Sequence, residues 1–314
     1  MRPSALFSGP GRGHHGNVST FSIPGPSRTP PAASTPAPHP WNRYVALGDS
    51  FTEGYGDPEP RSPGGVRGWA DRVAEELSLG HQDFAYANLA VRGRLLQQIV
   101  DDQLGPALEL KPDLVTLSAG GNDIVFRGSD PDRLAERLEP AIALLSATGA
   151  TVVLFTGPDW GSTPVFGRIR GKVAIFNENM RTIAARHDGV VADLWSLRQL
   201  AAPHMWDPDR LHFSPLGHHT IAAMVLETLN VPHTLKPLEP KVLPVGSWRQ
   251  ARSSDLVWAK DYLFPWVVRR VRQRPANLGL TAKRPEPGPV FGPGMAHGPL
   301  RAGPFPTGPM PAKP

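Results

Sequence analysis

Apolar residues follow two alternating patterns between residues 44 and 229. Runs of four or five apolar residues, many of them β-branched, are typical of strands buried on both faces of a sheet. Apolar residues spaced four apart, such as Trp69, Val73 and Leu77, predict helices. The predicted strands are residues 44–47, 85–89, 114–117, 151–155 and 190–194. The predicted helices are residues 68–77, 95–104, 131–148, 173–187 and 215–229.

The strict alternation of strands and helices predicts the fold class. Parallel strands must be joined by crossover connections, usually helices, which cover both faces of the sheet. We therefore expect an α/β fold, a three-layer α/β/α sandwich with a five-stranded, mainly parallel sheet. In such sheets ligands bind outside the carboxyl ends of the strands. This rule directs attention to the loops after the first, second, third and fifth strands.

The two ends of the 314-residue chain differ in composition from its middle. Residues 1–41 are rich in Pro, Ser, Thr, Ala and Gly, and residues 276–314 contain 10 of the 37 prolines. Such composition is typical of disorder. The sequence thus predicts a disordered extension at 1–41, a folded domain at 42–232, an extension with an amphipathic helix at 233–275 and a disordered tail at 276–314. A start codon assigned too far upstream explains residues 1–41 equally well.

Composition also excludes several classes of protein. The absence of cysteine rules out a disulfide framework, a cysteine-ligated zinc and a catalytic thiol. No stretch approaches the roughly eighteen apolar residues of a membrane span, and the first residues lack the apolar core of a secretory signal. We expect a cytoplasmic protein. The net charge of +5 arises at the ends of the chain, because residues 41–230 alone carry −7.

Residues 255–272 combine two tryptophans with a basic end. This combination is typical of a helix that lies on anionic lipid, and the basic C-terminal region also suits polyanions. An amphipathic helix docked on the folded domain accounts for the same residues, with Leu263, Val267 and Val271 facing inward. We favour the docked helix, so peripheral membrane contact is an alternative, and we expect no nucleic-acid partner.

Two loops carry residue types that suit nucleophilic catalysis. Ser50 follows the first strand in the run Gly-Asp-Ser, where a hydroxyl lies above the sheet edge, although a helix-capping role is equally compatible. Asp209 and His212 lie three residues apart in a later loop. A serine that attacks an acyl carbon needs a histidine base, and the base needs a carboxylate to hold it. An Asp–His turn alone is more often without function. The nearby His218 and His219 lie at the start of the next predicted helix, where we expect them to be solvent-facing or packed.

Two further loops contain donors suited to a negatively charged oxygen. Asn122 follows the third strand within Gly-Gly-Asn-Asp, and Gly93 follows the second strand within Val-Arg-Gly. An oxyanion is stabilised by preorganised neutral donors such as a side-chain amide or a backbone N–H. Both segments are also common turn sequences, so neither is specific alone.

Together, these four segments resemble the SGNH/GDSL hydrolase family of serine esterases and lipases. The resemblance extends from Arg43 to about Leu229, and the C-terminal stretch resembles the tail of actinobacterial members. It implies a flavodoxin-like fold and a serine esterase that uses no metal or organic cofactor and acts on a small-molecule ester. By this resemblance Ser50 is the nucleophile, His212 the base and Asp209 its orienting carboxylate. The oxyanion donors are the backbone N–H groups of Ser50 and Gly93 and the side chain of Asn122. Phe51 stands where the family most often has Leu.

Other residues near these segments are weaker candidates. Asp49 and Asp123 flank the expected site and are explained by side-chain-to-backbone hydrogen bonds that hold loops. Trp206 could line an acyl pocket, but we expect it in the core. Arg92 and Arg94 could bind a negatively charged substrate, but a solvated pair is commoner. A ligand-binding or membrane-surface protein that retains the fold without catalysis is the alternative function.

Overall fold

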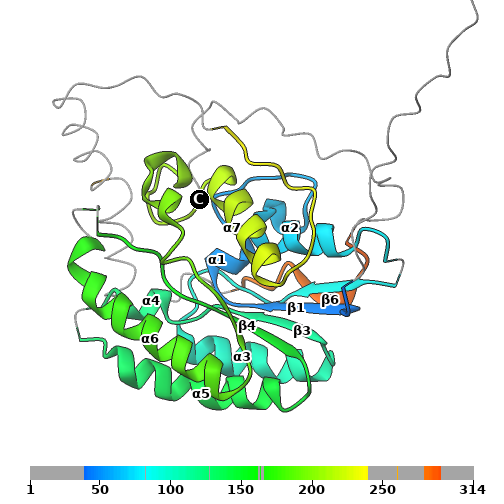
Figure 1. Cartoon of the computed structure of the whole chain (residues 1–314), viewed down its shortest axis with the longest axis horizontal. Helices are drawn as coiled ribbons and strands as arrows, with labels where there is room; N and C mark the ends of the chain where they lie inside the picture. Colours follow the sequence, from blue (N-terminus) through cyan, green and yellow to red (C-terminus); the bar gives the residue numbers. More distant parts are fainter. Residues whose placement is uncertain are drawn as a thin grey trace, which may run out of the picture. The chain divides into compact units, whose positions relative to one another are not determined.

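The computed structural model describes residues 39–81, 83–126, 128–161, 163, 166–239, 260 and 279–290. Its centre is a sheet in the order β5-β4-β3-β1-β2-β6 (Figure 1). The neighbouring strands from β5 to β2 pair in parallel, and β6 pairs antiparallel with β2. The strands are β1 (Arg43–Leu47), β2 (Ala85–Asn88), β3 (Leu114–Leu117), β4 (Thr151–Phe155), β5 (Val190–Ala192) and β6 (Arg284–Gly288).

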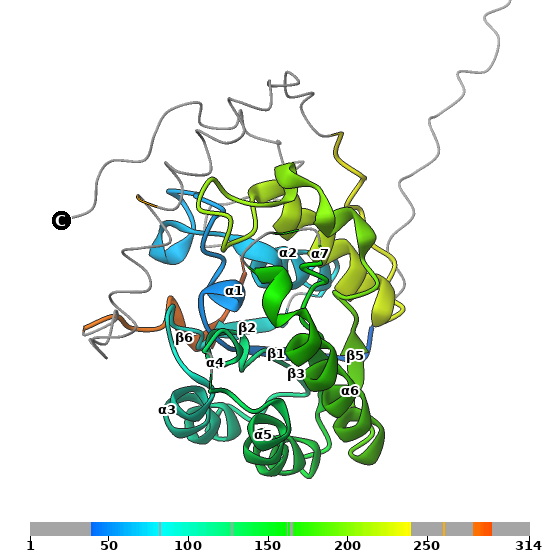
Figure 2. The same ribbon diagram turned by 90° about the vertical axis from the view of Figure 1, so that its left-hand side faces the viewer.

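Helices cover both faces of the sheet, so the structure is the expected α/β fold with a mainly parallel sheet (Figure 2). The α-helices are α1 (Ser50–Glu53), α2 (Gly68–Leu77), α3 (Leu96–Glu109), α4 (Gly121–Ile124), α5 (Pro131–Ser146), α6 (Arg170–Arg186) and α7 (Pro215–Thr228). The 3-10 turns are η1 (Pro63–Gly65), η2 (Phe166–Ile169), η3 (Arg198–Ala201) and η4 (Pro203–Met205). Helices α2 and α7 lie on one face, and α3, α5 and α6 lie on the other.

Alternation of side chains along β1 divides the core into two layers. Tyr44 and Ala46 belong to the cluster that packs under α2 and α7. Val45 and Leu47 belong to the cluster under α3, α5 and α6. All four side chains are buried, because successive residues of a strand point to opposite faces and each face is covered. The apolar run in the sequence therefore reflects burial on both sides.

The strand order places the chain reversal of the sheet between β1 and β3. The chain adds β2 on one side of β1 and then crosses to add β3, β4 and β5 on the other. In doubly wound sheets a crevice opens at this switch point, outside the carboxyl ends of the strands. Ser50 follows β1, and Asn122 follows β3. The topology alone therefore brings these two residues to one crevice.

A sixth strand corrects two expectations from the sequence. Arg284–Gly288 forms β6 within the segment 276–314 that we expected to be disordered, and the sheet has six strands in place of five. Asn88 lies opposite Arg284, and Tyr86 lies opposite Gly288. The strand contains two prolines, which cannot donate to a ladder and are typical of edge strands. Burial of Val290 in the first core layer shows that this segment packs as part of the domain.

Buried residues and hydrogen bonds also lie outside residues 42–232, on both sides of that range. Trp41, inside the expected extension, is buried and donates its indole N–H to Thr151 Oγ1 at 3.0 Å. After α7, the backbone N–H and the hydroxyl of Thr234 bond to the buried carboxylate of Glu76. Leu235 is buried in the first core layer.

The segment 255–272, which we expected to form an amphipathic helix, lies outside the described residues except for Lys260. Among the residues that are described, no helix is long and apolar enough to cross a membrane.

Candidate active site

The turn that carries Ser50 is fixed from below by a single glutamine. Gln103 accepts a hydrogen bond from the backbone N–H of Gly48 and donates one to its carbonyl, both at 2.8 Å. A Cβ on Gly48 would lie 2.5 Å from Thr52 Oγ1 and 2.9 Å from Ser118 O, so only glycine fits between the ends of β1 and β3. Asp49 then caps α1 by accepting from the N–H of Phe51. Ser50 is thus the first residue of a helix that starts at the sheet edge.

The structure brings Ser50, His212 and Asp209 together in a hydrogen-bonded chain. His212 Nε2 lies 3.0 Å from Ser50 Oγ, and His212 Nδ1 lies 2.6 Å from Asp209 Oδ2. The other carboxylate oxygen of Asp209 accepts from the backbone N–H groups of Leu211 and His212 at 2.9 and 3.0 Å. The carboxylate therefore holds both the loop and the imidazole ring.

The charge of Asp209 is stabilised where it lies. Burial alone would raise the pKa of this carboxyl, but the hydrogen bond and charge of His212, with the two backbone N–H groups, leave the pKa below its ordinary value. The neighbouring Asp207 behaves in the opposite way. Burial and the charge of Asp209 raise the pKa of Asp207 to about 6. Asp209 is thus the ionised partner of His212 at neutral pH.

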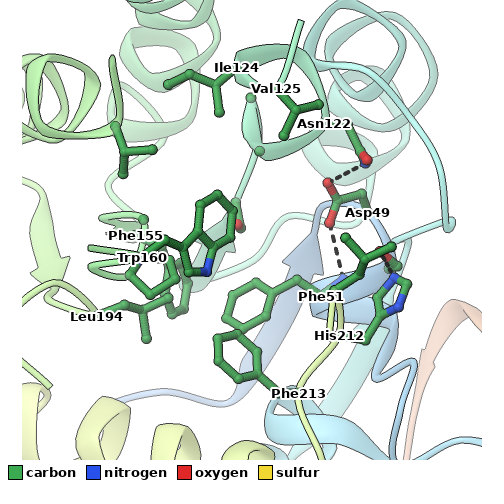
Figure 3. A pocket seen from close by; sticks show the side chains of 18 of the residues that line it. Asp49, Phe51, Asn122, Ile124, Val125, Phe155, Trp160, Leu194, His212 and Phe213 are labelled. Atoms are coloured by element: carbon green, nitrogen blue, oxygen red, sulfur yellow. Dashed lines mark hydrogen bonds between the residues drawn. The ribbon is translucent and has the colours of Figure 1, made fainter. Parts of the chain in front are cut away.

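Asn122, the second residue of α4, lines the crevice, and its amide contacts the loop that carries Gly93. The side-chain amide of Asn122 donates to Asp49 Oδ2 at 2.8 Å (Figure 3). It also donates to the carbonyl of Arg94 at 3.0 Å. Gly93 has a φ of 79°, a left-handed conformation that favours glycine. The bond between Asn122 and the carbonyl of Arg94 ties the loop after β3 to the Gly93 loop. Asp49 links the same amide to the Ser50 turn.

A partly buried ion pair, not singled out from the sequence, joins the Ser50 turn to the Gly93 loop. The carboxylate of Glu53 accepts from the backbone N–H of Arg92 at 2.7 Å and pairs with its guanidinium group. The guanidinium carbon lies 4.8 Å from the ring centre of Tyr55. Tyr55 in turn packs edge-to-face against His212, with ring centres 4.5 Å apart. These contacts fix one side of the imidazole.

The crevice continues into a pocket of about 160 Å³. Its polar end contains Ser50, His212, Asp49 and Asn122, and the rest is largely apolar and aromatic. Several lining residues, including Trp160 and Phe166, come from the loop after β4. We expected the site to be bordered by the loops after four strands and did not include the loop after β4, although the same rule about carboxyl ends applies to it.

The structure also places the weaker candidates. Trp206, which we expected in the core, lines the pocket and stacks on Phe213 with ring centres 4.3 Å apart, although it also packs against the first core layer. Arg92 and Arg94 are not a solvated pair, because they bond to Glu53 and Asp102. Asp123 accepts from the backbone N–H of Leu96 and so holds a loop.

The two histidines of α7 lie outside the hydrogen-bonded chain. His218 is fully buried: Nδ1 accepts from the N–H of Trp69, and Nε2 donates to the carbonyl of Tyr55. Burial lowers the pKa of His218 to about 4, which keeps the ring neutral. His219 is half-buried and bonds to the carbonyl of Lys236. In the part of the chain that the structure describes, no cluster of three or more His, Asp or Glu side chains suits a metal ion.

Residues 46–220 match the GDSL-like Lipase/Acylhydrolase family over more than half of the chain. The chain belongs to this family. No match to a curated protein was found. Among solved structures, this GDSL-like protein is similar to TesA, with 22% identity over 60% of this chain and 97% of that chain and a TM-score of 0.49.

Two other solved structures give similar values. A lipase/acylhydrolase from Enterococcus faecalis is 24% identical, with 63% of this chain and 99% of that chain covered and a TM-score of 0.49. The psychrotrophic esterase EstA from Pseudoalteromonas sp. is 16% identical, with 60% and 97% covered and a TM-score of 0.49. These similarities concern the fold of the GDSL-like domain only.

Proposed function

We propose that this protein is a serine esterase that cleaves carboxylic esters through an acyl-enzyme on Ser50, without a cofactor. The observation that carries the proposal is the continuous chain from Ser50 Oγ through His212 to Asp209, with both distances in hydrogen-bond range. A nucleophile, a base and a group that orients the base are the requirements of this chemistry. Membership of the GDSL-like family supports the same activity.

The first half of the proposed reaction forms the acyl-enzyme. Ser50 Oγ attacks the carbonyl carbon while His212 Nε2 takes the hydroxyl proton, and the carbonyl π electrons move to the oxygen. The tetrahedral intermediate collapses, the carbon–oxygen bond to the alcohol breaks, and His212 gives its proton to the leaving oxygen. Asp209 stabilises the imidazolium that exists between these two transfers.

The second half regenerates the enzyme. A water molecule attacks the acyl carbon while His212 takes one of its protons, and a second tetrahedral intermediate forms. The bond to Ser50 Oγ breaks, His212 returns the proton to the serine, and the carboxylic acid leaves. The reaction consumes one water and one ester and needs no other reactant.

The developing negative oxygen is assigned to the backbone N–H groups of Ser50 and Gly93 and the amide of Asn122. The amide is already aligned by Asp49 and the Arg94 carbonyl. An oxyanion therefore shares or takes over one of these two N–H bonds. These two bonds fix the position of the amide before the substrate binds, so one N–H has only to change its acceptor as the oxyanion forms.

Hydrolysis of p-nitrophenyl butanoate by the purified full chain tests the proposal. We expect Ser50→Ala to abolish turnover and Asp209→Asn to lower kcat by about 10⁴-fold. Ser62→Ala is the matched control, because the Ser62 side chain makes no capping hydrogen bond at η1. Equal turnover in wild type and Ser50→Ala would contradict the proposal.

The remaining expectations stay predictions. No observation favours a non-catalytic ligand-binding role, and membrane contact through residues 255–272 concerns a segment outside the described residues except for Lys260. The relation to actinobacterial members, the cytoplasmic location and the absence of a nucleic-acid partner remain expectations from the sequence. We propose that the hydrolase domain comprises residues 39–239 together with residues 279–290.

A further inference from the structure

The pocket beside Ser50 has two chemically different ends. Figure 3 shows Asp49, Asn122 and His212 on one side of the pocket, and Trp160, Phe155 and Leu194 on the opposite side. The first group supplies charge and hydrogen bonds, and the second supplies only apolar surface apart from the indole N–H. A substrate in this pocket is therefore oriented, with its reacting carboxyl at the polar end.

The chemistry of the ester decides which part of the substrate enters the apolar end. The leaving oxygen must face His212, because it receives the proton from Nε2. The carbonyl oxygen must face the donors of Asn122 and Gly93. The acyl substituent is the remaining group on the carbonyl carbon, so it extends away from His212 towards Trp160. The apolar end is thus an acyl pocket, and the alcohol lies towards the opening.

Aromatic rings in mutual contact form the walls of this acyl pocket. The Trp160 ring centre lies 5.1 Å from that of Phe166 and 6.3 Å from that of Trp206. Phe51 packs edge-to-face against Phe155, with ring centres 5.4 Å apart. Ring pairs at such distances stabilise one another beyond their burial. The walls are therefore held in place by their own contacts.

The charge in the pocket has one sign. Among the described residues that line it, Asp49 is the carboxylate, and no lysine or arginine is present. The nearby Arg92 pairs with Glu53, and Arg170 pairs with Asp159 and lies over the Trp195 ring. A carboxylate on the acyl group would lose its hydration without gaining a cation, which is strongly unfavourable.

The volume limits the size of the acyl group. An apolar cavity of about 150 Å³ holds one benzene molecule, that is, about six carbon atoms. The pocket volume of about 160 Å³ is close to this value. We propose, on the basis of the proposed function, that the pocket selects uncharged, apolar acyl groups of about six carbon atoms.

The test compares p-nitrophenyl esters of acetate, butanoate, hexanoate and decanoate with the adipate half-ester. We expect kcat/KM to rise by about fourfold per methylene up to hexanoate, the gain from burying one methylene, and to fall at decanoate. The adipate half-ester matches hexanoate in carbon number but ends in a carboxylate. We expect it to react at least about 100-fold more slowly than hexanoate, because its charge is desolvated without a partner. A maximum at acetate, a maximum at decanoate or equal rates for hexanoate and adipate would overturn the proposal.

Variants then test the assigned wall. Trp160→Ala removes the side chain at the far end, so we expect the optimum to move from hexanoate to decanoate. Trp160→Leu, which keeps an apolar side chain, should give an intermediate profile and serves if the alanine variant unfolds. Leu144→Ala is the control, because Leu144 is 53% exposed on α5 and does not line the pocket. An unchanged optimum in both Trp160 variants would contradict the assignment.

Active-site labelling separates failure of this inference from failure of the proposed function. A small fluorophosphonate requires a reactive serine but no extended acyl group. Labelling of Ser50 together with a maximum at acetate would overturn the acyl-pocket inference and leave the esterase proposal standing. Absence of both labelling and turnover would overturn the esterase proposal and, with it, the acyl-pocket inference.

Discussion

The buried pair Lys283–Asp71 attaches the C-terminal strand to the domain, and we expect Lys283→Met to destabilise the protein strongly. The ammonium group of Lys283 donates to Asp71 Oδ2 at 2.8 Å and to the carbonyls of Val66 and Arg67 at 3.2 and 2.9 Å. The two side chains are only 1% and 6% exposed. Methionine keeps most of the apolar stem but leaves the Asp71 carboxylate buried without a cation.

Loss of one partner from a buried ion pair costs about 3–5 kcal/mol. This is a large part of the roughly 5–15 kcal/mol that stabilises a typical domain. We do not expect the intact pair to add net stability to the fold, because burial lowers the pKa of Lys283 despite the charge of Asp71. The double variant Lys283→Met/Asp71→Asn removes both charges, so we expect it to be more stable than Lys283→Met alone.

Urea unfolding of the full chain near neutral pH measures these differences. Lys111→Met is the matched control, because Lys111 is exposed and its replacement should change stability by no more than about 0.5 kcal/mol. A double-mutant cycle over Lys283 and Asp71 gives the coupling free energy between the two side chains. A loss below about 1 kcal/mol for Lys283→Met, or additive effects in the cycle, would show that β6 is not held by this pair.

Three further predictions concern pH and the oxyanion donors. His218 stays neutral in the fold with a pKa of about 4, whereas its unfolded pKa is about 6.5, so acid favours the unfolded chain. As the pH falls from about 6.5 to about 4, the free energy of unfolding of wild type, measured with urea, should fall by up to about 3 kcal/mol relative to that of His218→Gln. A stability difference between the two proteins that does not change with pH would refute this. The pH dependence of stability that arises from Asp207 has the opposite sign. Its raised pKa means that the folded protein binds this proton more tightly than the unfolded chain does. As the pH rises from about 4 to about 7, the free energy of unfolding of Asp207→Asn should therefore rise by roughly 1–2 kcal/mol relative to wild type, a value reduced because Asp207 is partly exposed. A relative stabilisation of the variant as the pH falls would contradict this. Asn122→Ala should lower kcat on p-nitrophenyl butanoate by about 10²–10³-fold with little change in KM, and a change in KM alone would exclude an oxyanion role.

The parallel strands were predictable because each is buried on both faces by its own apolar residues. β4, with the sequence Thr-Val-Val-Leu-Phe, shows this directly. β6 was not predictable, because Arg-Pro-Glu-Pro-Gly has neither an apolar run nor alternation. It is held by pairing with β2 and by the buried contacts of Lys283, a residue more than two hundred positions from its partner Asp71. Local patterns carry no information about such contacts.

The polar part of the candidate site was predictable only from four segments taken together, because none of them is specific alone. Their combined resemblance to the GDSL-type hydrolases pointed to Ser50, Asp209 and His212, which the structure brings together. The aromatic pocket was not predictable, because whether Trp160 or Trp206 faces a cavity or the core depends on how distant loops pack. Tyr55 was missed for the same reason, since its contact with His212 joins residues far apart in the sequence.

Identification of the nucleophilic residue tests the central claim most directly. The full chain is treated with a fluorophosphonate, and the modified residue is located by peptide mass spectrometry in wild type and in the His212→Ala and Ser62→Ala variants. We expect a single adduct on Ser50, formed at the wild-type rate in Ser62→Ala and at least about 100-fold more slowly in His212→Ala, because the hydroxyl is a weak nucleophile without its base. An adduct on another residue, or ester hydrolysis that persists after Ser50 is fully modified, would contradict the account.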